Sequence, residues 1–247
     1  MSKQRINELT KLLQDYNYQY YVMDNSVVSD FEFDSLLKEL QELEEKHPEF
    51  ASALSPTKRV GGDVTKKFEQ VVHKYPMLSL SNSYSKEDII DFETRIKKLT
   101  NDEIEYVCEL KYDGVAIGIQ YINGEFHQAV TRGDGSKGEN VSTNVKTIKS
   151  IPLKLRGDFP GDFEIRGEIF FPLKNFEKLN KLRAANDEPL YANPRNTASG
   201  TLKSLDSSIA AERGLDCFLY GIYGENIEIN NHFDLVKKAE EWGFKVP

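Results

Sequence analysis

The sequence predicts an α+β fold, with a small helical N-terminal domain followed by a domain of mainly antiparallel sheets flanked by helices. Apolar residues recur at helical spacing over residues 1–50. Beyond residue 104 the period changes to two, and Asn123-Gly124 joins two alternating segments, which is the strongest short hairpin signal. The chain has 247 residues, of which 39% are hydrophobic. A chain of this length can bury a sizeable core, and it predicts one large domain with a second, smaller one.

The first fifty residues predict a helical hairpin. The first helix carries its apolar residues at helical spacing: Ile6, Leu9, Leu12, Leu13, Tyr16 and Tyr20. A second helix begins at Ser29, with Glu32 at the capping-box position, and His47-Pro48 ends it. Residues 55–62 predict a linker or a surface loop.

The larger domain begins with a helix and continues with strands. Ser85 and Asp88 predict a capped helix whose apolar stripe is Ile89, Phe92, Ile96 and Leu99. Strands are expected at 104–110, 114–122, 125–131, 163–171 and 216–223. Pro172 is expected at the first position of a helix that runs through Leu182. The hairpins argue against a doubly wound parallel sheet.

Composition excludes several classes. The net charge is −8, so the chain is not a simple basic nucleic-acid coat, although local basic faces can still bind phosphates. Two such stretches are 132–156, with 6 basic and 2 acidic residues, and 171–205, with 6 and 3. Either could be solvated surface instead. The two cysteines fit no zinc spacing, and no apolar run approaches membrane-spanning length, so we expect a reduced cytoplasmic protein.

Lys111 is the first candidate catalytic residue. It lies in Glu109-Leu110-Lys111-Tyr112-Asp113-Gly114, where an alternating strand would point Lys111 to the same side as Glu109 and Asp113. Gly114 would allow a sharp turn. An unprotonated lysine amine is a nucleophile. The other interpretation is a surface lysine in a salt-bridged strand.

Three further segments carry candidate groups. Thr131-Arg132-Gly133-Asp134-Gly135 could present N–H groups and a guanidinium to a phosphate, or be an ordinary surface turn, and it matches neither the Walker A nor the dinucleotide pattern. Strand 163–171 places Glu164, Arg166 and Glu168 on one face; we favour an exposed face over a covered site. Segment 193–203 is small, polar and basic, and would suit a nucleic-acid backbone or a loop.

In this order, the segments resemble the N-terminal part of bacterial NAD-dependent DNA ligases. Lys111–Gly114 resembles the KxDG nucleophile motif of that family, and 131–135 resembles its TRGDG segment. Residues 163–168 and 193–200 resemble its ExRGE and NPRNxxxG segments. Pro76-Met77-Leu78-Ser79-Leu80 and Asp30-Phe31-Glu32-Phe33-Asp34 resemble its PMLSL and D-x-x-[YF]-D elements.

The resemblance implies an adenylation module that uses NAD and Mg²⁺. Residues 1–66 would recognise the nicotinamide mononucleotide (NMN) half of NAD, and 67–247 would form a nucleotidyltransferase domain, truncated at its C-terminal end. Lys111 would attack NAD and hold AMP, which would pass to the 5′-phosphate of a nick in double-stranded DNA, as in replication and repair. The 3′-hydroxyl would then seal the strand. We expect a monomer.

The resemblance also implies residue roles. Asp113 would orient the catalytic Lys111 or a metal, Glu109 would contact adenine, Arg132 the AMP moiety, and Glu168 the ribose or magnesium. Ser79 and Leu80 would line the nucleotide site. No protein metal ligand set is assigned. NMN would be held by the cap residues Tyr20, Tyr21, Asp30, Phe31, Glu32, Phe33 and Asp34. Arg195 and Lys203 would touch DNA phosphates or the rim of the adenylate pocket.

The sequence departs from the family pattern in places. Histidine is common at Tyr21, tyrosine at Phe33 and arginine at Lys203, so hydrogen bonding at these three positions differs. Two later lysine-bearing motifs are missing, as are the oligonucleotide-binding, zinc-finger, helix-hairpin-helix and breast-cancer-type C-terminal domains. We therefore expect a fragment that does not seal nicks alone. The alternatives are an ATP-dependent KxDG nucleotidyltransferase, against which the 66-residue cap argues, and a non-catalytic nucleotide- or DNA-binding module.

Overall fold

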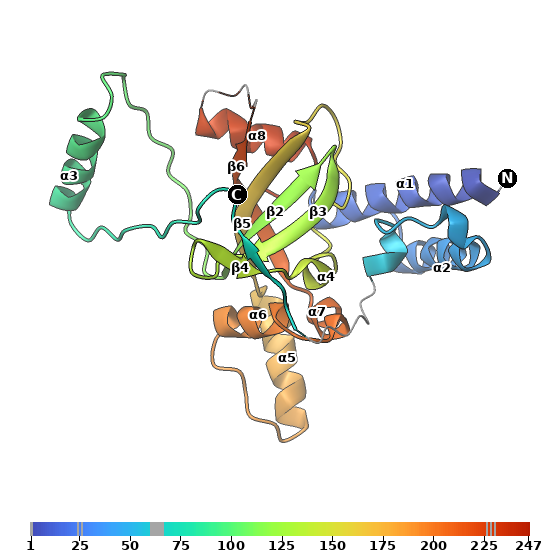
Figure 1. Ribbon diagram of the computed structural model, residues 1–247. Coiled ribbons are helices and arrows are strands. Elements are labelled where there is room, and N and C mark those ends of the chain that lie inside the picture. Colours follow the sequence, from blue (N-terminus) through green and yellow to red (C-terminus); the bar gives the residue numbers. More distant parts are fainter. Residues whose placement is uncertain are drawn as a thin grey trace.

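A four-stranded sheet forms the centre of the molecule, with the N-terminal helical hairpin on one side and α5–α7 below (Figure 1). The computed structural model describes residues 2–23, 25, 27–59, 67–225, 227, 229 and 231–247. The side chains of Tyr21 and Asp30, and the expected domain boundary at residue 66, lie outside this description. The expected α+β class is confirmed.

The central sheet is antiparallel throughout, in the order β3-β2-β5-β6. Its strands are β2 (Val115–Ile122), β3 (Glu125–Thr131), β5 (Asp162–Phe170) and β6 (Asp216–Gly224), close to the expected ranges. Asn123 and Gly124 both have positive φ, 49° and 75°, as the turn of the predicted β2–β3 hairpin requires. A second, two-stranded sheet pairs β1 (Gln70–Val72) with β4 (Lys137–Glu139).

One face of the central sheet carries the hydrophobic core. Ile117, Ile119 and Tyr121 alternate along β2 and are fully buried. They belong to one core cluster with buried residues of α4 (Ser142–Val145), α6 (Pro194–Leu202) and α8 (His232–Glu241). The Tyr121 ring packs 5.1 Å from Phe244 and 5.7 Å from Phe163, between ring centroids.

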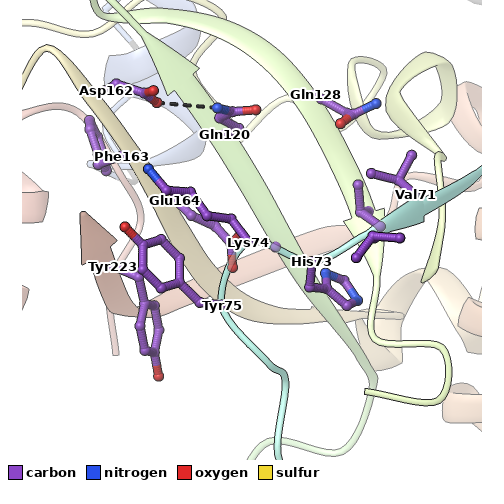
Figure 2. Close-up of a pocket in the computed structure, with 13 residues that line it drawn as sticks. Val71, His73, Lys74, Tyr75, Gln120, Gln128, Asp162, Phe163, Glu164 and Tyr223 are labelled. Atoms are coloured by element: carbon purple, nitrogen blue, oxygen red, sulfur yellow. Dashed lines mark hydrogen bonds between the residues drawn. The ribbon is translucent and has the colours of Figure 1, made fainter. Parts of the chain in front are cut away.

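The opposite face of the sheet is covered at Arg166, contrary to the exposed face we favoured. Segment 71–75 crosses it and encloses a small cavity of about 90 Å³, where Gln120 also donates to Asp162 (Figure 2). The Arg166 side chain is 8% exposed, pairs with Glu164 at 2.6 Å and donates to the carbonyls of Tyr75 and Pro76. Its charge is thus neutralised and hydrogen-bonded, which is what permits its burial.

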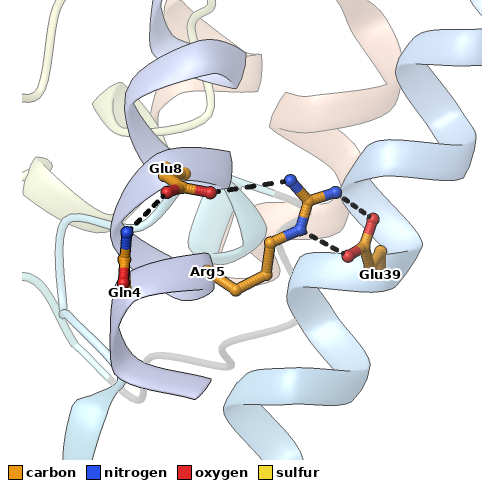
Figure 3. Close-up of polar contacts among 4 residues, drawn as sticks. All are labelled: Gln4, Arg5, Glu8 and Glu39. Atoms are coloured by element: carbon orange, nitrogen blue, oxygen red, sulfur yellow. Dashed lines mark hydrogen bonds and ion pairs between the residues drawn. The ribbon is translucent and has the colours of Figure 1, made fainter. Parts of the chain in front are cut away.

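The N-terminal hairpin consists of α1 (Ser2–Tyr21) and α2 (Asp30–Lys46), followed by the short η1 (Pro48–Phe50) and η2 (Pro56–Arg59). The Ser29 hydroxyl caps α2 by accepting from the Glu32 N–H, as expected. The hairpin has a hydrophobic core of its own, formed by four fully or nearly buried residues: Ile6, Leu9, Leu13 and Leu40. On its surface Arg5 donates twice to Glu39, at 2.7 and 2.9 Å (Figure 3).

The hairpin attaches near the β2–β3 turn. The Arg156 guanidinium donates to Asp15 at 2.9 Å and lies 4.0 Å from the centre of the Tyr18 ring. Leu155, the neighbour of Arg156, donates its N–H to the Gly124 carbonyl. From η2, Arg59 donates to three carbonyls of segment 148–151. These contacts place the hairpin at the end of the sheet where β2 ends.

The expected strand at 104–110 is wrong. Residues 103–113 form neither helix nor strand. The helix before them, α3 (Lys86–Lys97), lies away from the sheet and is joined to it by long irregular segments (Figure 1). The capping box of Ser85 and Asp88 is present, but no residue of α3 is buried. Of its apolar stripe, Ile96 is half-buried and the other three residues are exposed. Alternating residues favour extended backbone, but a strand also needs a neighbour for its hydrogen bonds.

Two local expectations also need correction. Pro172 is the N-cap of α5 (Leu173–Ala185), one position before the expected one. Segment 193–203, open to a loop interpretation, contains helix α6, because Asn193 caps it and Pro194 fits its first turn. Helix α7 (Ser207–Arg213) follows it. Among the described helices, none has the length and apolarity to cross a bilayer.

Candidate active site

Lys111 lies just before β2, where the chain joins the sheet. Gly114 is buried against the neighbouring β5, and a Cβ at this position would lie 2.2 Å from the carbonyl oxygen of Ile169. Glycine is therefore needed for close approach of two backbones, and the chain also bends at this residue, as expected. The contact fixes the base of the exposed Lys111 segment beside the end of β5.

Charged groups gather around this segment. Glu168 of β5 accepts the Gly114 N–H, and its carboxylate senses the charges of Lys111 and Arg195. Burial raises the pKa of Glu168, while those two cations and the Gly114 hydrogen bond oppose the rise. Arg195, in the first turn of α6, donates to Asp113 at 3.1 Å. The structure thus brings Glu168 and Arg195, which are distant in sequence, to the segment that carries Lys111 and Asp113.

Aromatic residues that the sequence did not single out anchor the Lys111 segment. The Tyr112 ring stacks 4.6 Å from the Phe218 ring, and Phe218 stacks 5.3 Å from Phe170. Tyr220 lies two residues along β6, and its hydroxyl donates to Glu168 at 3.4 Å. The only advance signal was the alternation within 216–223, because the pairing of β6 with β5 decides what these side chains meet.

Arg132 and Ser79 form a second group. The 131–135 segment is a tight turn in which Gly133 and Gly135 have positive φ and Asp134 accepts the N–H groups of Ser136 and Lys137. Arg132 Nη1 donates to Ser79 Oγ at 3.4 Å. The turn also holds the segment leading to Ser79, since Met77 donates its N–H to the Gly135 carbonyl. Leu80, next to Ser79, is 80% exposed.

Other expected site residues contact different partners or are exposed. Glu109 is 3.0 Å from His232 of α8, and Lys203 pairs with Glu139. In the hairpin Tyr20, Phe31, Glu32 and Asp34 are exposed, whereas Phe33 packs against the hairpin core. The hairpin attaches where β2 ends, and Lys111 precedes its start. The eight residues of β2 separate the two ends by roughly 25 Å.

Two family models match this chain. Residues 1–61 match the family model described as DNA ligase-like, N-terminal NAD+-binding domain. Residues 65–247 match the model of the NAD-dependent DNA ligase adenylation domain. The chain belongs to the NAD-dependent DNA ligase family.

Curated relatives support the same family. The DNA ligase of Christiangramia forsetii is 56% identical over 99% of this chain. Those of Flavobacterium johnsoniae and Bacteroides fragilis are 54% and 52% identical over the same share. In each case the chain spans 37% of the relative's length. The family resemblance drawn from the motifs is thereby confirmed.

The residues around Lys111 fit the magnesium that this ligase family implies. Within the described ranges, no three His, Cys, Asp or Glu side chains converge on one point. A Mg²⁺ ion that accompanies substrate phosphates needs only one or two protein carboxylates and otherwise keeps its waters. Glu168 and Asp113 lie at the Lys111 segment and would supply such carboxylates.

Proposed function

We propose that this chain is the part of an NAD-dependent DNA ligase that activates the enzyme with AMP. The supporting observation is the anchored Lys111, with Glu168 and Arg195 beside it and Arg132 on a turn of its own. The unprotonated Lys111 amine attacks the α-phosphorus of NAD. A P–N bond forms, the P–O bond to NMN breaks, and NMN leaves with the electron pair of that bond.

The surrounding residues have distinct roles in this step. Gly114 and Tyr112 hold Lys111 in place, which favours an in-line attack. Arg132 and Arg195 supply positive charge for the phosphates, and Ser79 and Leu80 line the nucleotide site. Glu109 contacts adenine, for which it exchanges its present partner His232. Glu168 and Asp113 orient the ribose, Lys111 or a magnesium ion.

The cap residues act on the NMN half of NAD. Tyr20, Phe31, Glu32, Phe33 and Asp34 belong to the hairpin, at the end of β2 remote from Lys111. A hairpin that holds NMN beside Lys111 must therefore turn toward the start of β2 before the reaction. Tyr21 and Asp30 are proposed to take part in the same contact. X-ray scattering with and without NAD tests this movement; an unchanged profile on NAD binding would contradict it.

The later steps require the full-length enzyme. AMP passes from Lys111 to the 5′-phosphate of a DNA nick, and the 3′-hydroxyl displaces it and seals the strand. Arg195 and Lys203 contact phosphates on the way. We infer that the enzyme works as a cytoplasmic monomer in DNA replication and repair, with NAD and magnesium and without a membrane.

Intact-mass spectrometry tests the central step. After incubation with NAD and magnesium we expect an adduct of one AMP on the wild type and on the control Lys174→Ala, but not on Lys111→Ala. Lys174 is an exposed lysine of α5, so its removal controls for loss of a positive charge. An adduct formed from ATP, but not from NAD, would place the chain with ATP-dependent nucleotidyltransferases. An adduct retained by Lys111→Ala would exclude this nucleophile.

A further inference from the structure

A cleft of about 1040 Å³ separates α1 of the hairpin from segment 149–156 of the larger domain. Its walls include Asn17 and Tyr18 on one side and Lys149, Ser150 and Arg156 on the other. The cleft lies by the β2–β3 turn, at the opposite end of the sheet from Lys111, so the proposed adenylation step does not use it. Its size suits a small organic ligand.

Two polar atoms in the walls of this cleft are buried without a partner. Asn17 is 6% exposed and Ser150 is 3% exposed. Within the described part of the chain, neither Asn17 Oδ1 nor Ser150 Oγ has a hydrogen-bonding partner. Buried polar atoms of this kind are uncommon, because burial removes their hydrogen bonds to water. Both atoms can accept a hydrogen bond from a hydroxyl group, and Ser150 can also donate one.

The charge of the cleft is positive overall. Its basic residues are Lys11, Arg59, Lys149, Lys154 and Arg156. Three acidic residues oppose them, of which Asp15 and Glu125 pair with Arg156 and Lys154, and Glu8 lies near Arg5. No carboxylate of the described chain pairs with Lys149.

The surroundings of Lys149 disfavour its charge. Burial, and then the nearby Arg59 guanidinium, lower the pKa of Lys149 to about 8. At neutral pH most of this ammonium is nevertheless protonated. An anion in the cleft would neutralise it in a partly desolvated position, where charge-assisted hydrogen bonds are strong.

We propose that this cleft binds a phosphate monoester that carries hydroxyl groups, with its phosphate against Lys149 and its hydroxyls on Asn17 Oδ1 and Ser150 Oγ, each of which a side-chain rotation turns from its buried position toward the ligand. This is the shared chemistry of sugar phosphates and nucleoside monophosphates. Because α1 and segment 149–156 belong to different domains, the bound ester bridges them and favours the hairpin orientation described above. The inference does not depend on the proposed adenylation activity.

Isothermal titration calorimetry of the whole chain tests the site, with ribose 5-phosphate as the probe. Ribose and inorganic phosphate each present half of the probe, and AMP represents the nucleotide source. We expect Lys149→Gln to weaken ribose 5-phosphate binding about tenfold or more, the loss of a charge-assisted hydrogen bond. The control Lys174→Gln removes an exposed lysine of α5 and should leave affinity unchanged.

A second variant separates binding from folding. Ser150 Oγ makes no hydrogen bond to the described chain, so Ser150→Ala should melt at the wild-type temperature. It should weaken ribose 5-phosphate about threefold or more and leave inorganic phosphate unaffected. Tighter binding of AMP than of ribose 5-phosphate, lost in Lys149→Gln, would identify the nucleotide as the source. Absence of saturable wild-type binding, or equal affinities for wild type and Lys149→Gln, would overturn the proposal.

Discussion

Substitution of Arg166 by methionine should destabilise the larger domain strongly. Its guanidinium is buried, pairs with Glu164 at 2.6 Å, donates to the carbonyls of Tyr75 and Pro76 and lies 4.0 Å from the centre of the Tyr223 ring. The substitution leaves the Glu164 carboxylate, itself only 14% exposed, without this partner. Removal of one partner of a buried ion pair costs about 3–5 kcal/mol, and we expect a loss in that range.

Matched variants separate charge burial from packing. The double variant Glu164→Gln, Arg166→Met leaves no unpaired buried charge. It should therefore recover about half of the stability that Arg166→Met alone loses. Arg5→Met breaks a pair of similar geometry, Arg5 to Glu39, on the exposed hairpin surface. Its effect should be far smaller, because water solvates both charges.

Urea denaturation measures these differences. The single tryptophan, Trp242, is buried in the core and reports on the larger domain by its fluorescence. Far-UV circular dichroism follows the hairpin as well. A loss for Arg166→Met no greater than that for Arg5→Met would refute the reasoning. Arg166 also holds the segment that leads to Ser79, through the carbonyls of Tyr75 and Pro76, so the variant should form the AMP adduct more slowly under native conditions.

Three further predictions follow from single positions. Gly114→Ala should lower the free energy of unfolding by about 1–3 kcal/mol and slow adduct formation more than tenfold, because the new Cβ meets the Ile169 carbonyl. Gly161→Ala is the control, since nothing lies within 4 Å of a Cβ at that position. Equal urea midpoints for the two variants would contradict the prediction. Burial raises the pKa of Glu168, so its stabilising contribution is present below the unfolded pKa and is lost as the pH rises through the folded value. The melting temperature of Glu168→Gln should therefore rise relative to that of the wild type as the pH increases from 4 to 7. The pKa of Lys149 is lowered to about 8, so the wild type should gain stability relative to Lys149→Gln as the pH rises from about 7.5 to 9.5; a constant difference would count against the burial of this charge.

Local patterns in the sequence determined the elements whose signals are complete within a short stretch. The Asn123-Gly124 turn, the Ser29 and Ser85 caps and the alternation of 163–171 depend on backbone conformation and neighbouring residues alone. The family motifs likewise identified Lys111, Arg132 and Glu168 as candidates, and the comparisons confirmed the family.

Tertiary structure decided what these elements meet. Alternation at 104–110 predicted a strand, but strand formation needs a hydrogen-bonding neighbour that no local pattern encodes. We expected Arg166 to be exposed, but segment 71–75 and the adjoining Pro76 cover it. The grouping of Lys111 with Glu168 and Arg195, the partner of Glu109, and the cleft beside Lys149 all join residues distant in the chain. Such contacts follow from strand register and domain docking, and these depend on the free energy of the whole packed chain.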